Sequence, residues 1–145
     1  MSQTEDFLTK SEEQEIVQAI VEAEKNTSGE IRVHLEEHSD KEPLVRAQEV
    51  FFELSMQKTK ARNGVLIYIG VKDKHLAIIG DEGINNVVAS DFWDCTKDLI
   101  IVNFKEGNYK KGLVEGILRA GEQLKKHFPF QSDDTNELSN EISKG

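Results

Sequence analysis

Near the middle of the chain lies an unbroken apolar run, Val65 to Ile69. It is rich in β-branched and aromatic side chains and is bounded by Gly64 and Gly70, a pattern typical of a strand covered on both faces. A short polar turn follows, and then a second apolar run, Leu76 to Ile79. Two apolar runs joined by so short a turn predict an antiparallel hairpin whose first strand is interior to the sheet.

Upstream of this hairpin the pattern changes from alternating to helical. Apolar and polar residues alternate over residues 31–35, which predicts a half-exposed or edge strand. Residues 43–54 carry apolar side chains along one face, and Pro43 suits the first turn of a helix. Because this helix joins the first two strands, the strands should be parallel, with a right-handed crossover.

Two more helices flank this central unit. The first follows Thr9, which can form a capping box with Glu12, and it ends before the turn at 26–29. The other starts near Asp91, and its last part, residues 99–104, can also be read as a strand, because periodicity does not settle so short an apolar run.

A last helix follows Asn108 and ends before Pro129, and the spacing of Gly112 and Gly116 on one face predicts a close approach to the sheet. Residues 131–145 are polar and acidic, and we expect them to form a disordered tail behind a single domain of residues 1–130. The fold class predicted is α/β: a three-layer αβα sandwich, with a small mixed sheet of about four strands and helices on both faces.

Composition narrows the function classes. The 145 residues suit one domain, and a net charge of −9 with no Lys/Arg cluster argues against nucleic-acid binding. No apolar run reaches the ~18 residues of a membrane span, and no secretory signal is evident, so we expect a cytoplasmic monomer. With Cys95 as the single cysteine, neither an internal disulfide nor a cysteine-based zinc site can form.

The strand ends carry the candidate chemistry. If the first two strands are parallel and the third runs back, Glu30 and the glycine-flanked pair Asp81 and Glu82 meet at one edge of the sheet. Asp91 and Asp94 begin the helix that follows. Carboxylates gathered from several loops suit a hard dication, so calcium is the predicted metal and magnesium the alternative.

Simpler interpretations stand beside this one. Asp91 can be only a helix cap, and Asp81 with Glu82 only a solvated turn. His34 and the other histidines show no zinc-type spacing and are expected at the surface, while Cys95 is expected to be a small buried hydrophobe. No nucleotide-binding or nucleophile motif supports those chemistries.

Five short motifs, in this order, resemble the TPM domain family: residues 27–33 (TSGEIRV), 62–67 (RNGVLI), 80–84 (GDEGI), 92–93 (FW) and 104–109 (FKEGNY). The family includes thylakoid-lumen proteins of photosystem II repair, a nematode acetylcholine-receptor modulator and many bacterial proteins. The resemblance covers residues 5–128 and implies an αβα sandwich of about four strands. It also implies the divalent-metal sites described for some members and the acid phosphatase activity claimed for others.

Three functions follow as hypotheses. The first is a stand-alone domain that binds calcium at the acidic loops, as a metal-responsive regulatory or interaction module. The second is a metal-assisted acid phosphatase, which would need cationic groups for phosphate, and this edge offers only Arg62 or Arg32. The third is a structural module that binds an unidentified protein partner without metal.

Overall fold

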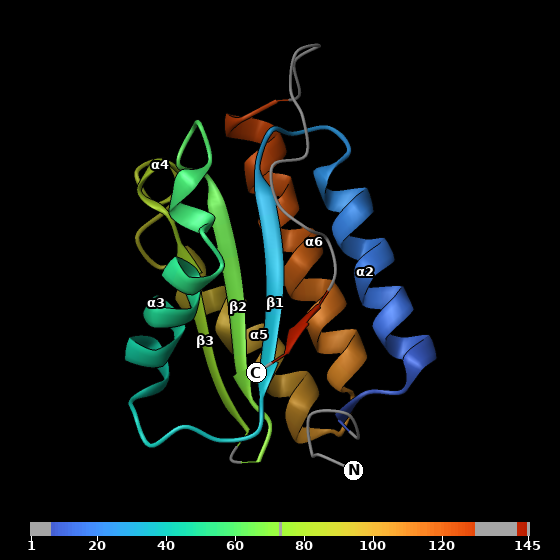
Figure 1. Cartoon of the computed structure of the whole chain (residues 1–145). Coiled ribbons are helices and arrows are strands. Elements are labelled where there is room, and N and C mark those ends of the chain that lie inside the picture. Colours follow the sequence, from blue (N-terminus) through green and yellow to red (C-terminus); the bar gives the residue numbers. More distant parts are fainter. Residues whose placement is uncertain (1–6, 73, 130–141, 145) are drawn as a thin grey trace.

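The computed structural model describes residues 7–72, 74–129 and 142–144. Its sheet has four strands in the order β3-β2-β1-β4 (Figure 1). They span β1 (Glu30–Glu36), β2 (Gly64–Gly70), β3 (His75–Gly80) and β4 (Ser143–Lys144). β2 is parallel to β1 and antiparallel to β3, so the predicted hairpin and the interior position of its first strand are confirmed.

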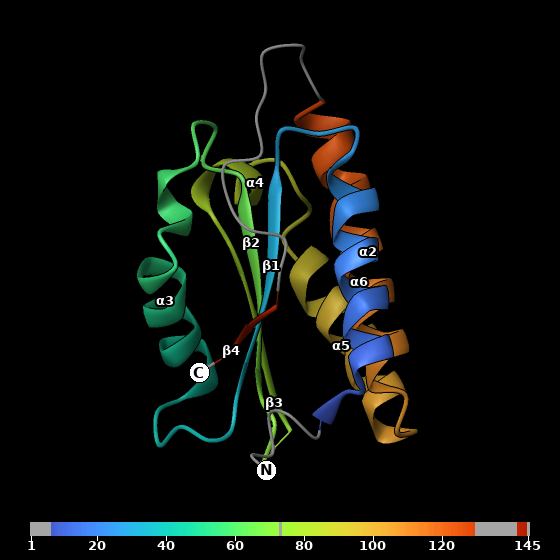
Figure 2. The same ribbon diagram turned by 45° about the vertical axis from the view of Figure 1, so that its right-hand side comes forward.

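Helices cover both faces of the sheet (Figure 2). One face carries α2 (Lys10–Glu24), α5 (Phe92–Lys105) and α6 (Tyr109–His127), and the opposite face carries α3 (Pro43–Glu53). Two short pieces complete the chain, the 3-10 turn η1 (Met56–Lys58) and α4 (Glu82–Asn85). The predicted three-layer α/β sandwich is confirmed.

Local signals begin the helices where the sequence places them. The Thr9 hydroxyl accepts from the Glu12 amide at 3.0 Å, and the Glu12 carboxylate accepts from the Thr9 amide at 3.0 Å, which completes the capping box. Pro43 is the first residue of α3. Residues 99–104 are helical: Ile100 and Phe104, four apart, are buried, while Val102 between them is 57% exposed.

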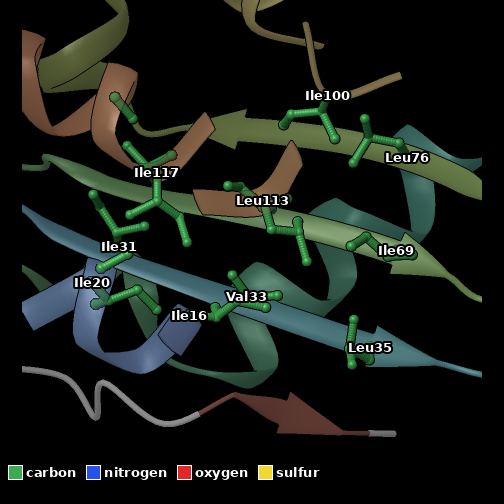
Figure 3. Close-up of a cluster of buried hydrophobic side chains, with 14 of the residues drawn as sticks. Ile16, Ile20, Ile31, Val33, Leu35, Ile69, Leu76, Ile100, Leu113 and Ile117 are labelled. Atoms are coloured by element: carbon green, nitrogen blue, oxygen red, sulfur yellow. The ribbon is translucent and has the colours of Figure 1, made fainter. Parts of the chain in front are cut away.

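The larger core lies between the sheet and the three-helix layer (Figure 3). Its strand residues are the odd-numbered apolar positions of β1 and β2, which point to one face because side chains alternate along a strand, together with Leu76 of β3. Ile16 and Ile20 of α2 and Leu113 and Ile117 of α6 close over them. The even-numbered Leu66 and Tyr68 face α3 in a second, smaller core.

The structure corrects two expectations about β1. This strand is not half-exposed, because six of its seven residues are buried. His34, expected at the surface, is 5% exposed, and Glu36 is equally buried. Both lie on the α3 side, where Arg46 of α3 donates to Glu36 at 2.9 and 3.0 Å. A charged partner from the covering helix allows an acidic strand position to be buried.

The close approach predicted for the glycines of α6 exists, but it is to α5 rather than to the sheet. A Cβ on Gly112 would lie 3.0 Å from the Asn103 Cβ, and one on Gly116 would lie 2.6 Å from the Ile100 Cδ1. Glycine at these positions lets α5 and α6 pack closely on the same face of the sheet.

Part of the predicted disordered tail is described. Residues 131–141 and 145 lie outside the described residues, but Ser143–Lys144 form β4 beside β1, so the predicted disorder does not extend to them. The outer edge of β1 gives this segment a backbone partner that its own sequence does not announce. No helix among the described residues is long and apolar enough to cross a membrane.

Candidate cation-binding site

Three strand ends form one edge of the sheet, as predicted. Glu30 is the register partner of Gly64, and Val65 is the partner of Gly80, so the starts of β1 and β2 lie beside the end of β3. This edge is at the top of Figure 1, next to α4. It brings Glu30, Asp81 and Glu82 to the same end of the molecule.

Asp81 is 7% exposed and accepts three hydrogen bonds. One comes from the Glu82 amide at 2.7 Å, which makes Asp81 the N-cap of α4. The other two come from Arg62, from Nε at 2.9 Å and from Nη2 at 3.0 Å. This contact with Asp81 raises the pKa of Arg62, and Arg62 Nη1 also lies 3.9 Å from Glu82. A resident arginine therefore neutralises the Asp81 carboxylate.

The loop bearing these carboxylates is pressed against the residues before β2. The Gly83 amide donates to the Arg62 carbonyl at 2.7 Å, and the Asp81 amide donates to the Gly64 carbonyl at 2.9 Å. A Cβ on Gly83 would lie only 2.2 Å from the Ala61 carbonyl oxygen, so this position requires glycine. The backbone thereby fixes Asp81 relative to Arg62, whose own φ is +53°.

Glu30, also predicted as a ligand, is 2% exposed and is hydrogen-bonded to Glu24. Glu24 is the last residue of α2, and its Oε2 accepts from the Ile31 amide at 2.8 Å. Burial raises the pKa of Glu24 to about 8; the Ile31 amide opposes this rise and the neighbouring Glu30 adds to it. The protonated form of Glu24 is therefore favoured near neutral pH.

Sequence reasoning missed Glu24. One signal was available, because an acidic residue at the end of a helix is disfavoured by the helix dipole and asks for an explanation. Here the explanation is tertiary: the side chain crosses to the start of β1 and satisfies the Ile31 amide.

The two remaining predicted ligands lie on the helix that follows α4. Asp91 and Asp94 are exposed at the start of α5. Asp91 occupies the N-cap position, but its side chain makes no capping hydrogen bond. Cys95 Sγ lies 3.8 Å from Asp91 Oδ2, and this cysteine is exposed, so the expectation that it is a buried hydrophobe is wrong.

A buried amide oxygen completes the polar groups at this edge. Asn63 is fully buried, and its Nδ2 donates to Ser28 Oγ at 3.2 Å. Its Oδ1 is buried and accepts no hydrogen bond. A buried polar atom without a hydrogen-bond donor is uncommon and needs an explanation.

The predicted cluster of five carboxylates is not assembled as one cage. Within residues 7–72, 74–129 and 142–144, no three His, Cys, Asp or Glu side chains are grouped closely enough to hold a metal ion. What the edge presents is two separate acidic pairs, Glu24 with Glu30 and Asp81 with Glu82. The assignment of calcium to this edge stays a prediction.

The comparison with protein families is decisive for identity. The model of the TPM domain matches residues 1–123. The chain belongs to the TPM domain family. Among curated proteins, none is similar enough in sequence to count as a match to this TPM domain.

Solved structures share the fold of this TPM domain. The NMR structure of the BA42 protein from the psychrophilic bacterium Bizionia argentinensis is 57% identical, covers 97% of each chain and superposes with a TM-score of 0.90. The N-terminal domain of a P. gingivalis protein is 19% identical, with a TM-score of 0.68 over 86% of this chain and 83% of that one. The N-terminal domain of the cg2496 protein from Corynebacterium glutamicum is 12% identical, with a TM-score of 0.64 over 81% and 74%. The last two likenesses show the fold alone.

Proposed function

We propose that this TPM domain binds a divalent cation, calcium in preference to magnesium, at the sheet edge that bears Glu30, Asp81 and Glu82, and that the ion orders the loops there for a regulatory or interaction role. Asp91 and Asp94 would supply further oxygens from the start of α5. The observation that carries the proposal is the pair of half-buried Glu24 and buried Glu30, two carboxyl groups in contact, in which burial and Glu30 raise the pKa of Glu24 to about 8.

A dication relieves the conflict in that pair. Two carboxylates confined in a poorly solvated site repel each other, and the pair responds by holding a proton. A divalent cation supplies more positive charge than the proton does, and its binding would release that proton. Calcium affinity should therefore rise with pH.

Asp81 and Glu82 offer a second way to exchange cations. The guanidinium of Arg62 now neutralises Asp81, and the Arg62 side chain is 48% exposed. When a metal ion takes its place, a half-exposed arginine can move into solvent, where water stabilises its charge. A fully buried arginine would have no water within reach and could not be displaced as easily. In this scheme Arg62 competes with the metal for Asp81.

The chemistry of the donors favours calcium. Carboxylate, amide and hydroxyl oxygens are hard ligands, and the site includes no thiolate. The groups come from several loops and from the ends of two helices, α2 and α5, an arrangement with no enforced octahedral geometry. Calcium accepts about 6–8 oxygens in irregular geometry, whereas magnesium requires a near-ideal octahedron.

A titration tests the proposal. Millimolar calcium should raise the melting temperature and shift the amide NMR signals of residues 28–31, 62–64 and 80–85. At about 100 times the dissociation constant, linkage adds about 2.7 kcal/mol to the free energy of unfolding. Asp81→Asn and Glu24→Gln should each remove most of that gain.

The matched control is Asp98→Asn, a change of the same kind at an exposed position of α5. It should leave the calcium response intact. If calcium at millimolar concentration moves neither the melting curve nor these amide signals, the edge does not bind the ion. A phosphate-ester assay run with the same samples tests the enzymatic alternative, which metal-dependent turnover would support.

A further inference from the structure

The two edges of β1 differ in how much of their length pairs with another strand. The inner edge faces β2 and the outer edge faces β4. β2 pairs with β1 along all seven residues, from Glu30 to Glu36. On the other side, among the residues that the structure describes, β4 pairs with β1 at two positions, His34 with Ser143 and Leu35 with Lys144. A strand edge carries backbone donors and acceptors along its length, and it is a template for an added strand.

Side chains anchor the short strand at three successive positions. Ile142 packs against the main core, Ser143 Oγ lies 2.9 Å from His34 Nδ1, and Lys144 Nζ lies 2.7 Å from Glu13 Oε1. The edge therefore recognises a short extended segment with an apolar residue, then a hydroxyl residue, then a basic residue. β4 runs parallel to β1, which fixes the direction in which this pattern is read.

The two polar anchors differ in character. Burial lowers the pKa of His34, which disfavours a charged ring, and its Nδ1 contacts the uncharged hydroxyl of Ser143. Glu13 lies on α2, and its ion pair with Lys144 is the one charge contact of the three anchors. This arrangement selects a basic residue over an acidic one at the position of Lys144.

We propose that the outer edge of β1, with Glu13 and His34, is a docking site for an extended segment of a partner protein in which a basic residue follows a hydroxyl residue, and that residues 142–144 occupy it as an intramolecular competitor. The partner segment adds a parallel strand, places Ser or Thr against His34, and places Lys or Arg against Glu13. Backbone pairing supplies affinity, and these two side chains supply specificity. This site is independent of the proposed cation site.

Because the competitor belongs to the same chain, its effective concentration is high and a free peptide must displace it. The test therefore uses the full chain with the three anchoring side chains of the competitor removed. This triple variant, Ile142→Gly, Ser143→Gly, Lys144→Gly, is called the blanked chain below. The probe is the hexapeptide Asn-Glu-Ile-Ser-Lys-Gly, copied from residues 140–145. Binding is followed by amide NMR on the protein.

We expect the peptide to shift the amide signals of residues 31–36 in the blanked chain, at concentrations about tenfold below those needed for the wild type. The single variant Lys144→Glu, which keeps the rest of the strand, should fall between the two. A peptide with Glu in place of Lys should not bind. That peptide should bind when Glu13→Lys is added to the blanked chain, because the charge pair is then restored in reverse.

Three outcomes would overturn the proposal. The first is a blanked chain that keeps its fold but shows no shift on β1. The second is equal peptide affinity in the wild type and the blanked chain, because a competitor is then absent. The third is a concentration-dependent dimer of the wild type, seen by sedimentation and lost in the blanked chain, because the occupant is then the tail of a second copy.

Discussion

The guanidinium of Arg62 holds both carboxylate oxygens of Asp81, with Nε 2.9 Å from Oδ2 and Nη2 3.0 Å from Oδ1. This contact joins Arg62, two residues before β2, to Asp81, the residue after β3, and the two strands are neighbours in the sheet. The Arg62 side chain is half-exposed and the Asp81 side chain is buried. Asp81 is therefore held in place, and Arg62 is the partner that can move out of the contact into solvent.

Removing Arg62 should therefore tighten calcium binding. In Arg62→Gln the Asp81 carboxylate loses its ion-pair partner, so calcium no longer has to displace the arginine side chain in order to bind. We expect the calcium midpoint to fall about two- to fivefold, the range that a partly exposed ion pair accounts for. Isothermal titration calorimetry measures this directly. Arg62→Lys keeps the positive charge and should stay within about twofold of the wild type, and weaker calcium binding by the Gln variant would contradict the competition.

Glu24 should make the protein less stable as the pH rises. Its pKa is about 8 in the folded state, against 4.5 as its ordinary value, so the folded state binds the additional proton between these two pH values. The free energy of unfolding should fall from pH 4.5 to pH 8 and change little above that. In Glu24→Gln no proton is needed, so this variant should be more stable than the wild type at pH 9, by about 1–3 kcal/mol.

Urea unfolding at pH 6 and pH 9, with EDTA present, checks this expectation. Glu22→Gln is the matched control, since Glu22 is on the same helix but is exposed and pairs only with Lys25 among its described contacts. That control should show the pH dependence of the wild type. A Glu24→Gln variant with the same pH dependence as the wild type would show that the Glu24–Glu30 pair holds no such proton.

Arg46→Leu should be strongly destabilising at neutral pH. Burial alone would raise the pKa of Glu36, but hydrogen bonds from Arg46, Tyr68 and His34 outweigh it and lower the pKa to about 2. Without Arg46 the buried carboxylate loses its charged partner, which costs about 2–4 kcal/mol. Chemical denaturation measures the loss. Lys41→Leu, which breaks an exposed ion pair with Glu49, should have little effect.

The Arg46–Glu36 pair also predicts that the free energy of unfolding decreases at acidic pH. The folded pKa of Glu36 lies below its ordinary value of 4.5, so its stabilisation is complete above about pH 4.5 and is lost as the pH falls toward 2. The difference in stability between the wild type and Arg46→Leu should therefore shrink between pH 7 and pH 3. An unchanged difference would place the cost of the substitution in packing rather than in the charge.

Gly121→Ala should destabilise the protein although alanine is the better helix former. A Cβ at position 121 would lie 2.7 Å from the Ala23 Cβ and 3.2 Å from the Ala23 Cα, so α2 itself must move away from α6. We expect a net loss of about 1–3 kcal/mol, since overpacking exceeds the gain in helix propensity. Gly116→Ala is the comparison, because its clash is with the Ile100 Cδ1, which can rotate, and it should cost less. Thermal unfolding ranks the two variants, and the reverse order would contradict this account.

Much of the fold was available from the sequence. The run Val65 to Ile69 determined a central strand, because five consecutive apolar side chains need cover on both faces. The short turn after it determined the hairpin, and Pro43 marked the start of α3. From these connections the shared edge of Glu30 and Asp81 followed without any knowledge of packing.

What the tertiary structure decided is which partner each polar side chain meets. The sequence put Asp81 at the right edge but did not show that Arg62 already holds it, and it did not reveal Glu24 beside Glu30. The alternating pattern of β1 also predicted that its polar side chains, such as His34, face solvent. In the structure α3 covers His34 and Glu36, and Arg46 donates hydrogen bonds to Glu36. β4 is the extreme case, since Ser143 reaches His34 across 109 residues of chain. Apolar periodicity is a property of neighbouring residues, so it can be read locally. The partner of a buried charge or of a strand edge is supplied by distant segments, and only the packing of the whole chain brings them together.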